Sequence, residues 1–261
     1  MRDLLNDIAE GLSHPDPIRR AQIQMKKPLP KRFYKTATVG ELDEGFSIEL
    51  DGKAIRTPAR KLLVVGTKPL AELVVREWEA QAELIDPSTM PVTRLVNTAI
   101  DGVAADIQAV FDDIVRFSAS DLLCYRADGP EALVKRQKEL WDPVLDWAAN
   151  ALGARFILIE GVMHHDQPRE AISAFSSALR RHDTATVLAA LHTITTLTGS
   201  ALLALAFAEG VVPAKEVWSL AHLDEDWTIE HWGRDEEAEE RREKRFEDFQ
   251  AAADVFLAMK G

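Results

Sequence analysis

The stretch Phe46–Thr57, which reads FSIELDGKAIRT, is the strongest indication of the fold. In FSIEL the apolar residues alternate with polar ones, which is the period of a strand with one buried face. Asp51-Gly52 follows directly, and this pair favours a two-residue hairpin turn because both central positions require a positive φ. KAIRT then resumes an extended pattern. The stretch therefore predicts a β-hairpin.

Neighbouring runs extend this hairpin into a small antiparallel sheet. FYKTATV, residues 33–39, alternates in the same way, and KLLVV, residues 61–65, ends at Gly66. A helix should follow, because Thr67 is a favourable N-cap and Pro69 fits the first helical turn. The apolar residues that would place this helix on the sheet are Leu70, Leu73, Val74, Trp78 and Ile85.

Beyond Met90 the apolar period becomes helical. We expect a break at Asp142-Pro143, with Asp142 capping a new helix, because proline removes a hydrogen bond from a helix interior. The run ARFILIEG, residues 154–161, allows either a strand or an extended connection. The expected helices are 91–101, 104–118, 130–141, 143–152, 168–180, 184–197, 200–209, 214–223 and 235–259.

These patterns predict an α+β protein. An N-terminal arm or linker, residues 1–30, is interrupted by several prolines. A small antiparallel β-sheet domain with a packed helix, residues 31–88, comes next. An all-helical C-terminal domain, residues 89–261, completes the chain.

The charge balance argues against several partners. A net charge of −12, from 43 acidic against 31 basic residues, disfavours binding to nucleic acid or to anionic membranes. The basic run KKPLPKR, residues 26–32, is expected to be a solvated arm. The longest apolar run, LTGSALLALAFA, is too short for a membrane span, so we expect no membrane insertion.

Cysteine usage and the N-terminus bear on location. Cys124 is the only cysteine and lies in an apolar run, which is typical of a buried structural thiol in a reducing compartment. The N-terminus MRDLLNDIAEG lacks a long apolar signal core, and its acidic residues argue against a mitochondrial presequence. We therefore expect a bacterial cytoplasmic protein.

Enzyme signatures were sought and none was found. The chain has no GxxxxGKS/T, GxGxxG, HExxH or GxSxG pattern. His164-His165-Asp166 is the densest potential metal site, but adjacent histidines in a loop rarely converge on one ion. Gly199 and Ser200 are expected to permit close helix packing. The sequence therefore predicts no catalytic residues, no metal and no cofactor.

Three stretches favour a binding function instead. WSLAHLDEDWTIEHW, residues 218–232, combines three tryptophans with four carboxylates, a composition typical of a surface groove or interface. EWEAQ, residues 77–81, places acids and an amide around Trp78. MPVTRLVNTAID, residues 90–101, puts Arg94, Asn97 and Asp101 near one helix face. Such polar residues suit either a network that ties two domains together or a groove that receives a partner.

Six motifs carry a family resemblance. EWEAQ, MPVTRLVNTAID, DLLCYRAD, WDPVLDWA, LTGSALLALA and LDEDWTIEHWG occur in this order. Together they resemble the assembly chaperones of ATP synthase, from about Lys31 to the C-terminus, and an alphaproteobacterial member in particular. The resemblance implies a non-enzymatic chaperone, monomeric when free, whose relatives in eukaryotes occupy the mitochondrial matrix. Its partner would be the α-subunit of the soluble F-one sector, whose unassembled apolar interface is prone to aggregation.

The resemblance also ties function to the acidic C-terminal segment, which here contains Asp224 and Glu225 beside Trp232. We expect both carboxylates to be at least partly exposed, and Trp218 and Trp227 mainly to pack. The further candidate partner-binding residues are Trp78, Glu79, Gln81, Arg94, Asn97 and Asp101.

An alternative from another functional class remains. Arg94, Asn97 and Asp101 could belong to a small-molecule enzyme or binding protein with its site between the two domains. A deep closed pocket would favour this alternative, whereas an open acidic and aromatic groove would favour a chaperone.

Overall fold

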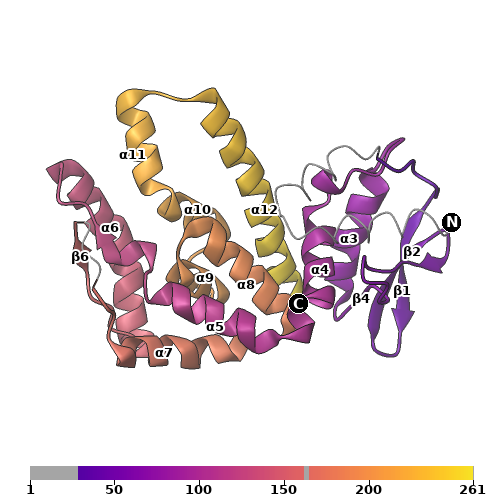
Figure 1. Cartoon of the computed structure of the whole chain (residues 1–261), viewed down its shortest axis with the longest axis horizontal. Helices are drawn as coiled ribbons and strands as arrows, with labels where there is room; N and C mark the ends of the chain where they lie inside the picture. The colour runs from indigo at the N-terminus through magenta and orange to yellow at the C-terminus, as the bar shows by residue number, and fades with distance from the viewer. Residues whose placement is uncertain (1–28, 162–164, 261) are drawn as a thin grey trace, which may run out of the picture. The chain divides into compact units, whose positions relative to one another are not determined.

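The computed structural model describes residues 29–161 and 165–260 (Figure 1). Most of the predicted arm, residues 1–28, lies outside the described residues, as does His164. Of the described residues, those up to Ala105 and those after Phe256 form one compact unit, and Asp106–Phe256 form a second. The unit with the sheet thus extends past residue 88, because helix α4 (Pro91–Asp101) packs on helix α3 (Lys68–Ala80).

The first unit contains the predicted antiparallel sheet. Strand β2 (Gly45–Leu50) pairs with β1 (Ala37–Leu42) on one side and with β3 (Lys53–Ala54) and β4 (Val64–Val65) on the other. Asp51 and Gly52 have φ values of 49° and 74°, so both central turn residues are left-handed. The hairpin prediction is confirmed.

Helix α3 lies on this sheet and begins as predicted. The Thr67 hydroxyl oxygen accepts a hydrogen bond from the Leu70 amide, and Pro69 lies in the first turn. The helix ends at Ala80 and does not continue to Ile85, because the segment after it pairs with the residues before the sheet. The Ile85 amide donates to the Pro30 carbonyl at 2.8 Å, which leaves Ile85 buried in the core of this unit.

The second unit is mainly helical. One parallel pair of two-residue strands, β5 (Tyr125–Arg126) and β6 (Ile159–Glu160), interrupts the predicted all-helical domain. The run ARFILIEG therefore ends in a short strand. The helices are α5 (Ile107–Ser118), α6 (Glu131–Trp147), α7 (Arg169–Leu179), α8 (Ala185–Thr198), α9 (Ala201–Ala208), α10 (Ala214–Ala221), α11 (Leu223–Trp232) and α12 (Glu236–Lys260).

Helix α6 passes through Pro143, and the predicted break at Asp142-Pro143 is wrong. Proline removes the hydrogen bond to the carbonyl four residues earlier, here that of Glu139. Both residues are exposed, so water can solvate that carbonyl group. Asp142 does not cap a helix; its carboxylate pairs with Arg126 at 2.8 Å.

The core of the second unit is built around α9, whose eight residues are all buried. The amide groups at its N-terminus therefore need acceptors inside the protein. The carboxylate of Asp121, which is fully buried, accepts hydrogen bonds from the Leu202 amide at 2.9 Å and the Ser200 hydroxyl at 2.7 Å. The Ser200 hydroxyl oxygen in turn accepts from the Leu203 amide at 3.0 Å.

The small residues before α9 are explained by this capping. Ser200 is the N-cap of α9, and Gly199 closes α8 with a φ of 68°. The sequence had predicted close helix packing for both residues and did not indicate these roles. None of the described helices combines the length and apolar character needed to cross a bilayer.

Asp121 should make stability depend on pH. Burial raises its pKa to about 6, against the opposing effect of hydrogen bonds from Leu202, Ser200 and Leu123. A folded-state pKa above the unfolded value means that stabilisation present at low pH is lost as pH rises. We expect wild type to lose about 1.4 kcal/mol of unfolding free energy between pH 5 and 7.5 relative to Asp121→Asn. Urea unfolding of both proteins at each pH measures this difference, and a constant difference would contradict it.

Candidate functional site

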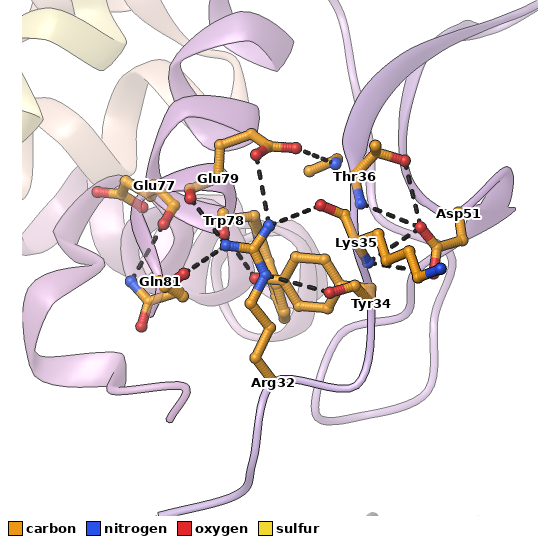
Figure 2. A network of polar contacts seen from close by, with 10 residues as sticks. Arg32, Tyr34, Lys35, Thr36, Asp51, Glu77, Trp78, Glu79 and Gln81 are labelled. Atoms are coloured by element: carbon orange, nitrogen blue, oxygen red, sulfur yellow. Dashed lines mark hydrogen bonds and ion pairs between the residues drawn. The ribbon is translucent and has the colours of Figure 1, made fainter. Parts of the chain in front are cut away.

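The candidate residues of EWEAQ surround the guanidinium of Arg32 (Figure 2). Arg32 donates to the backbone carbonyls of Glu79 at 3.0 Å, Lys35 at 2.9 Å and Tyr34 at 3.2 Å, and also to that of Gln81. Its guanidinium lies over the Tyr34 ring, 4.5 Å from the centroid. The expectation that the whole basic run 26–32 is a solvated arm is wrong at Arg32, which ties the start of the unit to the end of α3.

The neighbouring acid and amide are also engaged within the protein. One Glu79 oxygen accepts from the Ala37 amide, and the other lies 3.4 Å from Arg32. The Gln81 side chain is buried and donates to the Glu77 carbonyl, while its oxygen accepts from the Asp86 amide at 2.7 Å. Gln81 therefore stabilises the turn that follows α3, whereas Glu79 links α3 to the start of β1 and to Arg32.

Trp78 belongs to the same assembly. Its ring is half-buried and makes an edge contact with Tyr34 at a centroid distance of 5.7 Å. The Tyr34 hydroxyl donates to the Trp78 carbonyl at 2.5 Å. Trp78 thus packs against the apolar cluster formed by Tyr34, Ala37, Leu50, Ile85 and Met90.

Glu77 has a structural role that the sequence did not reveal. Its carboxylate accepts from the amides of Val92 and Thr93, each at 2.7 Å, and from the Thr93 hydroxyl at 2.6 Å. These amides lie in the first turn of α4, which has no capping side chain of its own. Burial raises the pKa of Glu77, and the hydrogen bonds oppose that effect. Glu77 therefore caps α4 from the neighbouring helix.

The three candidate residues on α4 have different surroundings. Asp101 accepts from the Thr57 hydroxyl at 2.6 Å and from the Ala59 amide at 3.0 Å, so both of its oxygens are occupied within the first unit. Asn97 is half-buried, and Arg94 is exposed. Only part of the predicted polar face is consequently available to a ligand.

The acidic, tryptophan-rich segment forms α10 and α11 in the second unit. Trp218 is buried against Phe246 and Phe249 of α12, as expected. His222, between the two helices, is buried, and this burial lowers its pKa. Its ring stacks on Trp218 at a centroid distance of 3.8 Å. This aromatic packing holds the start of α11 on the helical core.

Two side chains of α6 contact α11. The Gln137 amide donates to Asp224 at 2.8 Å, and Arg136 donates to both oxygens of Glu230 at 2.7 and 2.9 Å. Trp227 is half-buried, and the guanidinium carbon of Arg136 lies over its ring, 6.0 Å from the ring centroid. On the other side of α11, Asp226 pairs with Arg242 of α12 at 2.6 Å.

Glu225 and Trp232 remain directed to solvent. Trp232 is 77% exposed, the largest exposure among the large apolar side chains of the described residues. The Glu225 carboxylate is about half exposed and lies 4.0 Å from the ring of His222, whose pKa is lowered by burial. Asp224 is also exposed, although one of its oxygens is bonded to Gln137.

The described residues contain no group of three His, Cys, Asp or Glu side chains placed to bind a metal ion. Two histidines of the second unit pair with single acids: His192 with Asp113 at 2.7 Å, and His182 with Glu209 at 2.9 Å. Cys124 is buried, as expected, and burial raises the pKa of its thiol. These groups have structural partners.

Known proteins resemble this chain throughout its length. The family model described as ATP12 chaperone protein matches residues 31–149. The crystal structure of Atp12 from Paracoccus denitrificans has 36% sequence identity and a TM-score of 0.82, covering 88% of this chain and 98% of that one. The chain belongs to the ATP12 chaperone family. This membership confirms the predicted resemblance and identifies the protein as an assembly chaperone of ATP synthase.

Two further proteins extend the similarity. The Atu1473 protein from Agrobacterium tumefaciens is 66% identical, with a TM-score of 0.88, over 99% of this chain and 97% of its own. Protein atp12, mitochondrial, from Schizosaccharomyces pombe is 24% identical over 236 residues, which are 85% of this chain and 80% of the yeast protein. The predicted α+β fold, with a small sheet followed by a helical region, is that of Atp12.

Sequence reasoning did not find Arg32, Glu77, Asp121 or Gln137. A signal existed for Asp121, because it stands before an apolar run that requires every polar group to have a partner. For Arg32 there was none, since its acceptors are backbone carbonyls up to 49 residues away in the chain. Local patterns do not indicate such contacts.

Arg32→Lys should destabilise this ATP12 protein. An ammonium group cannot form the planar set of hydrogen bonds to carbonyls that the guanidinium makes. We expect a loss of about 2 kcal/mol of unfolding free energy, measured by urea denaturation. Arg56→Lys is the matched control, since exposed Arg56 donates to a single carbonyl, that of Arg60. Equal effects of the two substitutions would contradict the role of Arg32.

Proposed function

We propose that this chaperone binds the unassembled α-subunit of the soluble ATP synthase sector and covers its apolar subunit interface until β-subunits replace it. We further propose that it acts in the bacterial cytoplasm, as a monomer when free, and without catalysis. Family membership supports the assembly role. The single observation that carries the choice of surface is the outward side of α11, with Glu225 and Trp232 exposed.

The spacing of these two residues suits recognition of a folded surface. They are seven residues apart, so they lie on one side of the helix, about 10 Å apart along its axis. Exposed tryptophan is unfavourable in water and gains by insertion into an apolar recess. The adjacent carboxylate favours a partner with a cation near that recess. We call Glu225 and Trp232 the α11 outer face.

The remaining candidates contribute less directly. Glu79, Gln81 and Asp101 use their polar atoms within the first unit, so we assign them to its stability. Exposed Arg94 stays a candidate contact. A small-molecule enzyme is the less favoured alternative. Asp101 already accepts a hydrogen bond within the first unit, and the Asn97 side chain is half-buried. A ligand site built on these two residues would therefore need a rearrangement or further residues.

Substitutions on the α11 outer face should reduce client binding without unfolding the chaperone. We expect Trp232→Ala to weaken binding of purified α-subunit by on the order of 2 kcal/mol, or about thirty-fold. Glu225→Lys should weaken binding and increase light scattering of refolding α-subunit. Calorimetric titration gives the affinity, and circular dichroism confirms the fold of each variant.

Asp146→Lys provides the charge-reversal control. Asp146 is exposed on α6, and it has no ion pair among those found in residues 29–161 and 165–260. The Asp146→Lys variant should bind α-subunit like wild type. If Trp232→Ala and Glu225→Lys also bind like wild type, the α11 outer face is not the site. If wild type itself leaves α-subunit aggregation unchanged, the α-subunit is not the client.

A further inference from the structure

Consecutive residues of α6 hold the two ends of α11. Gln137 contacts Asp224 in the first turn of α11, and Arg136 contacts Glu230 in the last turn. The two acids are six residues apart, which corresponds to about 9 Å along the helix. We call these four side chains the α6 clamp. Two such points fix both the position and the tilt of a short helix.

Gln137 is unusually placed for a glutamine. Its side chain is 1% exposed, and both ends of its amide are used. The oxygen accepts from the Ala127 amide at 2.9 Å, and the nitrogen donates to Asp224 at 2.8 Å. A buried amide costs free energy unless its hydrogen bonds are satisfied. Gln137 therefore connects α11 rigidly to the segment that follows β5.

The Arg136 contact is more exposed and has a fixed geometry. A bidentate guanidinium–carboxylate pair restricts orientation more than a single contact does. The same guanidinium lies over the Trp227 ring. The side chains of the α6 clamp thus hold α11 in place, whereas Glu225 and Trp232 of α11 are directed to solvent.

We propose that Gln137 and Arg136 are positioning residues for client recognition, and that Asp224 serves mainly as their anchor on α11. This inference rests on the proposed function, because the α11 outer face is the surface being positioned. Holding that face in its binding orientation removes an ordering cost that client binding would otherwise carry. The two acids that stand side by side in the sequence, Asp224 and Glu225, therefore have different tasks.

Three variants separate an anchor from a contact. Asp224→Asn removes the charge but keeps an oxygen that can accept from Gln137, so α-subunit affinity should stay within two-fold of wild type. Gln137→Glu places a carboxylate against Asp224 and should weaken affinity about ten-fold. In the double variant, which combines Asp224→Asn with Gln137→Glu, the amide at position 224 can donate to the carboxylate at position 137. Its α-subunit affinity should return to within about three-fold of wild type.

The opposite pattern would overturn the inference. If Asp224→Asn alone weakens binding ten-fold or more, and the double variant stays as weak, then the charge of Asp224 contacts the client. Hydrogen exchange of residues 223–232 supplies a measurement that needs no client. Gln137→Glu should accelerate exchange there, and the double variant should restore it; unchanged exchange in Gln137→Glu would refute positioning whether or not α-subunit is the client.

Arg136→Met tests the other end of the clamp without burying a charge. It should accelerate exchange in the last turn of α11 and weaken α-subunit binding three- to ten-fold. Lys135→Met is the matched control, because it removes the same charge at the adjacent position, where the ion pair of Lys135 in the described part of the chain lies within α6, with Glu139. Equal effects of the two variants on exchange or binding would show that charge alone matters and would exclude the clamp.

Discussion

A helix that is apolar on every side brings the unpaired amides of its first turn into the core, where only protein groups can accept them. In this chaperone Asp121 and Ser200 accept hydrogen bonds from the first-turn amides of α9. Four other helices of the second unit depend on that arrangement, because α5, α6, α8 and α10 all contact α9. An ionised carboxylate in this place is costly, and its hydrogen bonds offset only part of that cost.

The first unit solves the same problem with other residues. Glu77 caps α4 from α3, and Arg32 satisfies carbonyls at the end of α3. Each side chain links segments that are distant in sequence and fixes where a helix begins or ends. The polar groups of EWEAQ therefore form a network inside this unit, whereas the sequence had suggested either a network between two domains or a groove for a partner.

Sequence alone predicted what depends on local chemistry. The hairpin followed from the φ requirement at Asp51-Gly52, and the start of α3 followed from Thr67. The end of α3 could not be predicted, because pairing of Ile85 with Pro30 displaces a helix that the apolar pattern would continue. The predicted break at Pro143 was wrong for a related reason. The free-energy cost of a proline inside a helix depends on whether the carbonyl that loses its hydrogen bond reaches water. Of the candidate site, the exposure of Asp224 and Glu225 was expected. For Glu79, Gln81 and Asp101 the sequence allowed either a polar network or a groove, because spacing does not tell where their hydrogen-bond partners come from.

Occupancy of oxygen atoms is what distinguishes one carboxylate from another in so acidic a chain. Glu77, Asp101 and Asp121 have donors from the protein on both oxygens, so each of them contributes to holding the fold. Asp224 gives one oxygen to Gln137, and Glu225 gives none to a hydrogen bond found in the described part of the chain. Under the proposed function, stability and recognition thus fall to adjacent residues of one helix turn. A charge reversal across both positions would mix the two effects, whereas single neutral substitutions keep them apart.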